Sequence, residues 1–232
     1  EKALVNNITP AGAEPHDYEL TAQDIANIES SQLLILNGGG FEPWSEDIIN
    51  SLNPQKTKII FVTERLQTNK TIMANYQEIL DPHVWLSPPL AKEIVAEINL
   101  ALKAISDKNT PFYQSNTEKL NQKLTNLDRQ FTIGLSKCRQ SSIITSHDAF
   151  GYLADTYQFR QVPISGLQPD VEPSPRQLAE LSDFAKNNQI SYIFFETLAS
   201  PKLAQTLAQD VGAKTLILNP LEGLSAREIA AN

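Results

Sequence analysis

Residues 142–164 read SIITSHDAFGYLADTYQFRQVPI, and they show the pattern from which the fold class is predicted. The stretch begins with the apolar run Ser142–Thr145, which has the length of a buried strand, and continues into a polar turn at residues 146–148. Residues 149–157 then have the pattern of a helix, and Arg160–Ile164 that of a second strand. Strand and helix in alternation predict an α/β fold.

The same alternation runs through the rest of the chain. Upstream, the predicted strands are Ala3–Ile8, Leu33–Leu36 and Lys58–Val62, and the predicted helices are residues 21–31 and 45–52. Downstream, strands at residues 190–196 and 214–218 alternate with helices at residues 175–187 and 201–211. Residues 64–80 have no clear pattern and are expected to be irregular.

Two long helices separate the two halves of the chain. The first is predicted at residues 88–106, and the second at Phe112–Cys138, where apolar residues recur every three or four positions. A helix of this second length extends about 40 Å, enough to bridge two lobes. We therefore expect an N-terminal α/β lobe at residues 1–110, a linking helix at 111–138 and a C-terminal α/β lobe at 139–232.

Composition excludes several classes of protein. The 232 residues are 41% hydrophobic and 20% charged, which is ordinary for a globular chain. A net charge of −8 repels phosphate backbones, so we expect no nucleic-acid partner. The longest apolar runs have the length of strands, so no segment is expected to span a membrane. The single cysteine, Cys138, can form neither an internal disulfide nor a cysteine-rich zinc site.

The first ten residues contain no signal peptide. They have neither a basic region nor a long apolar core. Two interpretations stay open on composition alone: a cytosolic protein, or a sequence that begins after an export signal has been removed.

The chain has three histidines, His16, His83 and His147, and each lies in a loop where one element ends and another begins. They are too far apart in the sequence for any local metal motif, so a site made from them would have to be assembled by the fold. Proline precedes His16 and His83 and stiffens the backbone that leads to each. Carboxylates lie beside all three, at Glu14, Asp81 and Asp148. A carboxylate there can hold the imidazole nitrogen that does not bind the metal.

With these residues in view, the sequence resembles the metal-binding receptors of ABC importers, the cluster A-I solute-binding proteins that take up zinc and manganese. It is most similar to the high-affinity zinc-uptake receptors. Five motifs carry the resemblance in the family's order: GAEPHDYEL at residues 12–20, LNGGGFEPW at 36–44, DPHVWLSP at 81–88, TSHDAFGYL at 145–153 and LNPLEGL at 218–224.

The resemblance implies two α/β lobes joined by one long rigid helix, with the metal in the cleft between the lobes. It also implies a monomeric receptor rather than an enzyme, which passes its metal to the membrane permease of an ABC importer. Such a receptor is periplasmic or is anchored, as a lipoprotein, on the outer face of the cell membrane. Relatives begin with a further strand and helix and end with a further helix, so we expect these to be missing or shortened here.

Carried over by motif, the implied ligands are His16 and His83 from the first lobe and His147 from the second. Manganese-selective relatives have a carboxylate where this chain has His147. Three imidazoles suit Zn²⁺ better than Mn²⁺, although copper and nickel also accept them. The cargo is therefore expected to be Zn²⁺, with manganese as the alternative.

The fourth ligand is expected to be Glu222, with Asn219 or a water molecule as alternatives. A neutral amide such as that of Asn219 is a poorer zinc ligand than a carboxylate. Glu196 follows a predicted strand, and it either supports an imidazole or is merely a charge at a strand end. Two other functions stay open: a zinc hydrolase with Glu14 or Glu222 as the general base, and an adhesin on the same fold.

Overall fold

The computed structural model describes residues 3–66, 68, 70–74, 77–166 and 172–223. By internal contacts the chain divides into two compact units, each built from separate stretches of sequence. Unit 1 takes in residues 1–69, 88–129 and 223–232, and unit 2 takes in residues 70–87 and 130–222. The division into lobes at 1–110, 111–138 and 139–232 stays a prediction.

Unit 1 is a small α/β layer structure around two parallel strands. β1 (Leu33–Leu36) pairs with β2 (Lys58–Phe61). Because side chains alternate along a strand, β1 contributes to two cores. Leu34 and Leu36 pack with Ile28 of α1 (Ala22–Ser30) and with α2 (Ser45–Ser51). On the other side, Leu33 packs against α4 (Pro88–Ile105).

The remaining elements of unit 1 are short, apart from the long helix α5. They are η1 (Pro15–Asp17), α3 (Val62–Arg65) and η3 (Asp107–Asn109). α5 runs over Thr110–Leu135, which confirms the expected long helix, and its residues belong to both units. Its first part lies alongside α4, where Lys103 and Asn99 both donate to the Gln114 side chain.

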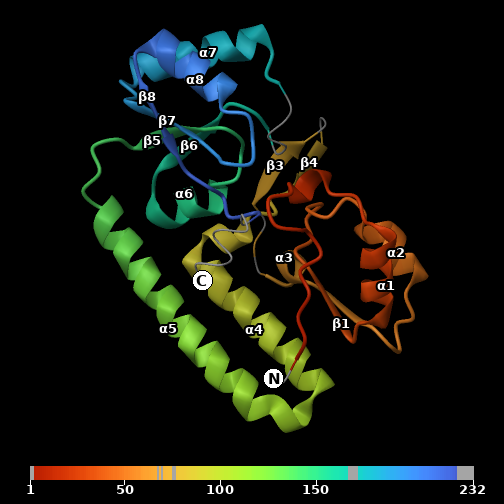
Figure 1. Ribbon diagram of the computed structural model, residues 1–232. Coiled ribbons are helices and arrows are strands. Elements are labelled where there is room, and N and C mark those ends of the chain that lie inside the picture. The colour runs from red at the N-terminus through yellow and green to blue at the C-terminus, as the bar shows by residue number, and fades with distance from the viewer. Residues whose placement is uncertain (1–2, 67, 69, 75–76, 167–171, 224–232) are drawn as a thin grey trace. The chain divides into compact units, whose positions relative to one another are not determined.

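Unit 2 contains a parallel sheet of four strands in the order β6-β5-β7-β8. The strands are β5 (Ser142–Thr145), β6 (Arg160–Pro163), β7 (Tyr192–Phe195) and β8 (Lys214–Ile217). Ile144 and Ile193 are fully buried in a core that they share with α7 (Pro175–Asn187) and α8 (Lys202–Val211). α6 (Gly151–Tyr157) belongs to a second core with Phe131 of α5. Figure 1 shows this sheet with its helices.

Two local expectations were wrong. Within residues 64–80, the described residues 71–74 and 77–80 are not irregular: β3 (Thr71–Ala74) and β4 (Gln77–Leu80) pair as antiparallel strands, and η2 (Val84–Leu86) follows β4 closely. These two strands are defined by their pairing with each other, from Thr71 opposite Leu80 to Ala74 opposite Gln77. Ala3–Ile8 is not a strand in the described part of the chain, and Leu4 and Val5 are 82% and 85% exposed. An apolar composition alone does not make a strand, because a strand also needs a partner.

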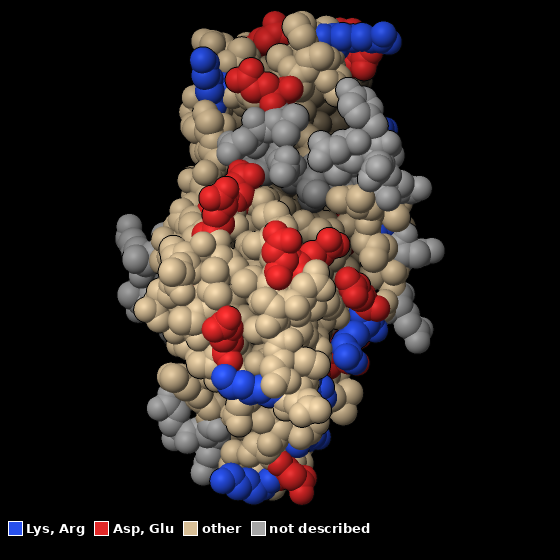
Figure 2. All heavy atoms as spheres, turned by 90° about the vertical axis from the view of Figure 1, so that its right-hand side faces the viewer, with Lys and Arg blue, Asp and Glu red and all other residues tan. Residues whose placement is uncertain are grey.

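The α/β fold class is confirmed. No helix among the described residues is long and apolar enough to cross a membrane. On the face shown in Figure 2, the described Lys and Arg side chains are scattered and form no continuous basic surface.

Candidate metal centre

In unit 2, one buried carboxylate is shared by two imidazoles. Glu222 Oε1 lies 3.1 Å from His83 Nε2 and 3.2 Å from His147 Nε2. The two rings have their centroids 5.4 Å apart. All three side chains are buried, and their ligand-type atoms lie within 4.8 Å of one another. This is a converging set of two nitrogens and one oxygen, the donor types that Zn²⁺ accepts.

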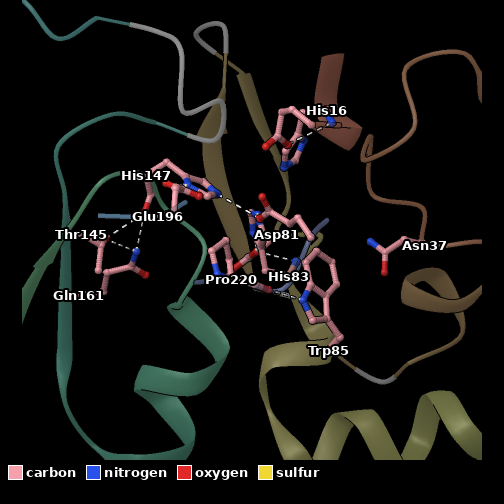
Figure 3. Close-up of polar contacts among 12 residues, drawn as sticks. His16, Asn37, Asp81, His83, Trp85, Thr145, His147, Gln161, Glu196 and Pro220 are labelled. Carbon is pink, nitrogen blue, oxygen red and sulfur yellow. Dashed lines mark hydrogen bonds and ion pairs between the residues drawn. The ribbon is translucent and has the colours of Figure 1, made fainter. Parts of the chain in front are cut away.

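A second carboxylate holds the outer nitrogen of each imidazole. His83 Nδ1 donates to Asp81 Oδ1 at 2.8 Å, and His147 Nδ1 donates to Glu196 Oε1 at 2.7 Å (Figure 3). These contacts turn each ring so that Nε2 points toward Glu222. A carboxylate in this position fixes the tautomer and raises the basicity of the imidazole as a ligand.

The pKa values of His83, His147 and Glu222 are all shifted by the groups around them. Burial alone would lower the pKa of His147, but its hydrogen bonds with Glu196 and Glu222 outweigh burial and raise the pKa to about 10. Burial also acts to lower the pKa of His83, yet Asp81 and Glu222 together raise it. Burial would raise the pKa of Glu222, but hydrogen bonds from His147 and His83 hold it well below its usual range. Without metal, protons therefore occupy the nitrogens that a cation would need.

The DPHVW segment places His83 by local geometry. It follows β4 directly, and the backbone N–H of His83 donates to Asp81 Oδ1 at 3.0 Å. Asp81 therefore binds both the backbone and the ring of His83. Trp85 Nε1 donates to the Pro220 carbonyl at 2.8 Å, which ties this segment to the loop that carries Glu222. In that loop Leu221 has φ +61°, an uncommon conformation for a large side chain and a local strain next to Glu222.

His147 is positioned from the strands of the parallel sheet. It lies just beyond β5, and its carbonyl accepts hydrogen bonds from Thr145 Oγ1 at 2.9 Å and from Gln161 Nε2 at 2.8 Å. Figure 3 shows these two side chains on the far side of His147 from His83. Glu196 follows β7, which neighbours β5 in the sheet. Side chains at the carboxyl ends of neighbouring parallel strands are brought together in this way.

Sequence reasoning did not single out Trp85 or Gln161. Trp85 lies in the DPHVWLSP motif, where the expected roles concerned Asp81 and His83. Gln161 is a polar residue in a strand, and pairing across from Ile143 brings it beside the turn that holds His147. A polar side chain inside a strand and partly removed from water is the signal that could have marked it, because such a group needs a partner.

The remaining predicted residues of unit 2 lie around this cluster. Asp148 is half-buried, and its pKa is raised by burial and by the charge of Asp81, while the histidines act in the opposite direction. Asn219 is half-buried in the same loop as Glu222. The supporting role expected of Asp148 and a metal contact by Asn219 both stay predictions.

In unit 1, His16 lies in the one-turn helix η1 and its side chain is buried. Its ring meets that of Phe41 edge to face, with the centroids 4.7 Å apart. Glu14 Oε1 accepts from the backbone N–H of His16 at 3.4 Å and so caps η1. The Phe41 loop is held in turn by Glu42, whose carboxylate accepts from the backbone N–H groups of Asn37 at 2.7 Å and Gly38 at 3.0 Å.

Fold and site together define an α/β protein with a buried histidine–glutamate cluster suited to a metal ion. The chain belongs to the ZnuA family, described as zinc-uptake complex component A, periplasmic, which matches residues 1–230. The resemblance to zinc-uptake receptors of ABC importers is thereby confirmed at the level of the family. This is a family of zinc-binding transport receptors.

Named relatives agree with this assignment. The chain is 37% identical to the high-affinity zinc uptake system protein ZnuA of Bacillus subtilis, covering 98% of this chain and 75% of the relative. It is also 37% identical to the zinc-binding lipoprotein AdcA of Streptococcus pneumoniae, covering all of this chain but 48% of the relative. The chain thus spans about half the length of the AdcA relatives.

Solved structures show the same fold. The Zn(II)-bound ZnuA-like domain of Streptococcus pneumoniae AdcA matches with a TM-score of 0.80 and 38% identity, over 97% of this chain and 82% of that one. The laminin-binding protein Lmb of Streptococcus agalactiae, described as an adhesin with metal-transporting activity, matches with a TM-score of 0.84 and 31% identity. That match covers 94% of this chain and 81% of Lmb. The expected two-lobe α/β fold is confirmed by these likenesses.

Proposed function

We propose that this chain is an extracytoplasmic receptor that binds Zn²⁺ as cargo and delivers it to the membrane permease of an ABC importer. One observation carries the proposal: Glu222 Oε1 lies within 3.2 Å of the Nε2 atoms of both His83 and His147. Each of these imidazoles is backed by its own carboxylate. This is the arrangement by which proteins prepare histidines to bind a divalent metal.

The proposed ligands are His83, His147 and Glu222 from unit 2, with His16 from unit 1 as the fourth. His16 is assigned from the GAEPHDYEL motif and from the preference of Zn²⁺ for four protein ligands in sites that only hold it. A closed set of four leaves no position for a reacting water molecule. This supports a binding protein over a hydrolase, whose zinc keeps one position open.

Zinc is proposed over manganese because of the donor atoms. Three imidazole nitrogens with one carboxylate oxygen suit Zn²⁺, while Mn²⁺ prefers more oxygen ligands. Glu222 is proposed over Asn219 as the oxygen ligand, because a carboxylate binds Zn²⁺ better than an amide and Glu222 already lies between the two imidazoles. Asp81 and Glu196 are proposed to hold the outer imidazole nitrogens, with Glu14 and Asp148 supporting the loops.

We further propose that the receptor works as a monomer, outside the cytoplasm, either in a periplasm or anchored to the outer face of the cell membrane. The family description, which names a periplasmic component of an uptake complex, supports this location. The name of AdcA as a lipoprotein supports an anchored form.

Calorimetric titration of metal-stripped protein with Zn²⁺ and then Mn²⁺ tests the proposal. We expect one zinc site per chain, tighter than manganese, and a large loss of zinc affinity in Glu222→Gln. Glu180→Gln is the matched control, because Glu180 is an exposed partner of Arg176 in helix α7. A preference for manganese, or equal zinc affinity in both variants, contradicts the assignment.

A further inference from the structure

Gly151, the first residue of α6, lies against the carboxylate that supports His83. A Cβ atom at this position would be 2.8 Å from Asp81 Oδ2 and closer still to Cε of Lys70. Such a distance to a carboxylate oxygen is far inside van der Waals contact. Because Gly151 has no side chain, the Asp81 carboxylate can lie against its backbone. Glycine is required here for this close approach and not for an unusual backbone angle.

Asp81 has little freedom to avoid such a side chain. It is fully buried, and its Oδ1 atom accepts from both the backbone N–H and the Nδ1 of His83. Its other oxygen, Oδ2, has no hydrogen-bond partner among the described residues and faces Gly151. Because a carboxylate is rigid and planar, displacing Oδ2 also displaces Oδ1 and disturbs its contacts with His83.

Helix α6 is also held in place against this segment. Lys70 Nζ donates to Asp155 Oδ2 at 2.6 Å, and Ser87 Oγ and Thr156 Oγ1 share a hydrogen bond of 2.9 Å. The Lys70 carbonyl in turn accepts from the Asp81 backbone N–H at 3.0 Å. The helix is therefore attached on both sides of the Asp81–His83 segment, and a new side chain at 151 cannot be accommodated by moving α6 alone.

We infer that Gly151 is a positioning residue for zinc binding, because its missing side chain allows Asp81 to hold the outer nitrogen of His83. The inference rests on the proposed function, since it concerns the same ligand His83. Gly151 touches no metal and acts only through Asp81. Loss of a carboxylate partner behind a metal-binding histidine typically costs 10–100-fold in affinity, so we expect Gly151→Ala to weaken zinc binding about 10-fold.

The experiment measures zinc dissociation constants by competition with a chelator of known affinity. The proteins are the native chain, Gly151→Ala, Asp81→Ala, the double variant of these two, and Gly134→Ala as the control. Gly134 lies in α5, and a Cβ there would meet nothing within 4 Å. We expect weaker binding in Gly151→Ala, native affinity in Gly134→Ala, and no further loss when Gly151→Ala is added to Asp81→Ala.

That lack of additivity separates positioning from general damage to the fold, because truncated Asp81 no longer meets the added Cβ. The inference is overturned if Gly151→Ala binds zinc with native affinity. It is also overturned if Gly151→Ala lowers zinc affinity equally in the native chain and in the Asp81→Ala variant. Gly151→Ala could also destabilise the fold through its close contact with Lys70 Cε. It is therefore also measured on a Lys70→Ala background, where that contact is absent. Full restoration of affinity there, or failure to fold on both backgrounds, overturns the inference as well. If the native chain binds no zinc, the proposed function itself fails, which is a distinct result.

Discussion

His147 and Glu196 lie 49 positions apart in the sequence, yet the Nδ1 of the imidazole and the Oε1 of the carboxylate are 2.7 Å apart. The two residues follow β5 and β7, which are neighbours in the parallel sheet. Both side chains are almost completely buried. The order of the strands in the sheet therefore brings the two side chains together. The contact with Glu196 orients the imidazole of His147, a proposed zinc ligand, and favours its protonated form.

Glu196→Gln should weaken zinc binding by about 10-fold, because the amide keeps the size of the side chain but loses the charge that makes His147 a stronger ligand. The measurement is a zinc dissociation constant by chelator competition. The exposed Glu180→Gln variant is the control and should bind like the native chain. Equal affinities in the two variants would show that Glu196 is only a charge at a strand end.

Zinc binding at pH 7 should release protons, because both His83 and His147 have raised pKa values and a metal binds only neutral imidazole. Calorimetry in buffers with different ionisation enthalpies measures the number of protons released, and we expect at least one, from His147. Affinity should fall steadily from alkaline pH downward rather than only below about pH 6.5, the ordinary pKa of histidine. An observed heat that is the same in every buffer would contradict this.

The metal-free protein should lose stability as the pH rises toward 10. The pKa of His147 is raised from 6.5 to about 10, so its contribution is fully present below pH 6.5 and is lost as the pH rises through 10. The contribution of protonated His147 to the free energy of unfolding is on the order of a few kcal/mol. The lowered pKa of Glu222 arises in part from the same contact with His147, so it is not a separate contribution.

Urea unfolding of metal-stripped protein between pH 6.5 and pH 10 checks this expectation. The His147→Gln variant is the reference and should show a weaker dependence on pH over that range. With zinc bound the trend should reverse, because zinc takes the place of the protons and binds more tightly at high pH. A metal-free stability that rises over the same range would rule out protonated His147.

Trp85→Phe should weaken zinc binding a few-fold and cost about 1 kcal/mol of stability, the typical net value of a hydrogen bond. The substitution removes the bond from Nε1 to the Pro220 carbonyl, which fixes the loop that carries Glu222. Trp44→Phe in unit 1 is the matched control for the loss of an indole, and it should leave zinc affinity unchanged. Affinity and urea unfolding are measured on both variants, and equal affinity loss would contradict the role of Trp85.

Most of the helices and strands, and the metal-binding chemistry of the histidines, could be predicted from the sequence. Short apolar runs that alternate with helical segments predicted the strands before and after His147. The three histidines at element boundaries predicted a metal site. The support of His83 by Asp81 was also within reach of the sequence, because the two residues are only two positions apart. Short local patterns failed at the β3–β4 pair and at Ala3–Ile8, where pairing between strands decides the outcome.

The contacts between the imidazoles and carboxylates from distant parts of the chain depend on tertiary packing. Glu222 lies beside His147 from 75 positions away, and Glu196 reaches it through the order of strands in the sheet. No spacing in the sequence encodes either contact, since strand order and loop geometry follow from packing of the whole unit. The physical reason is burial: charged groups removed from water must find opposite charges, and only the folded chain brings these together.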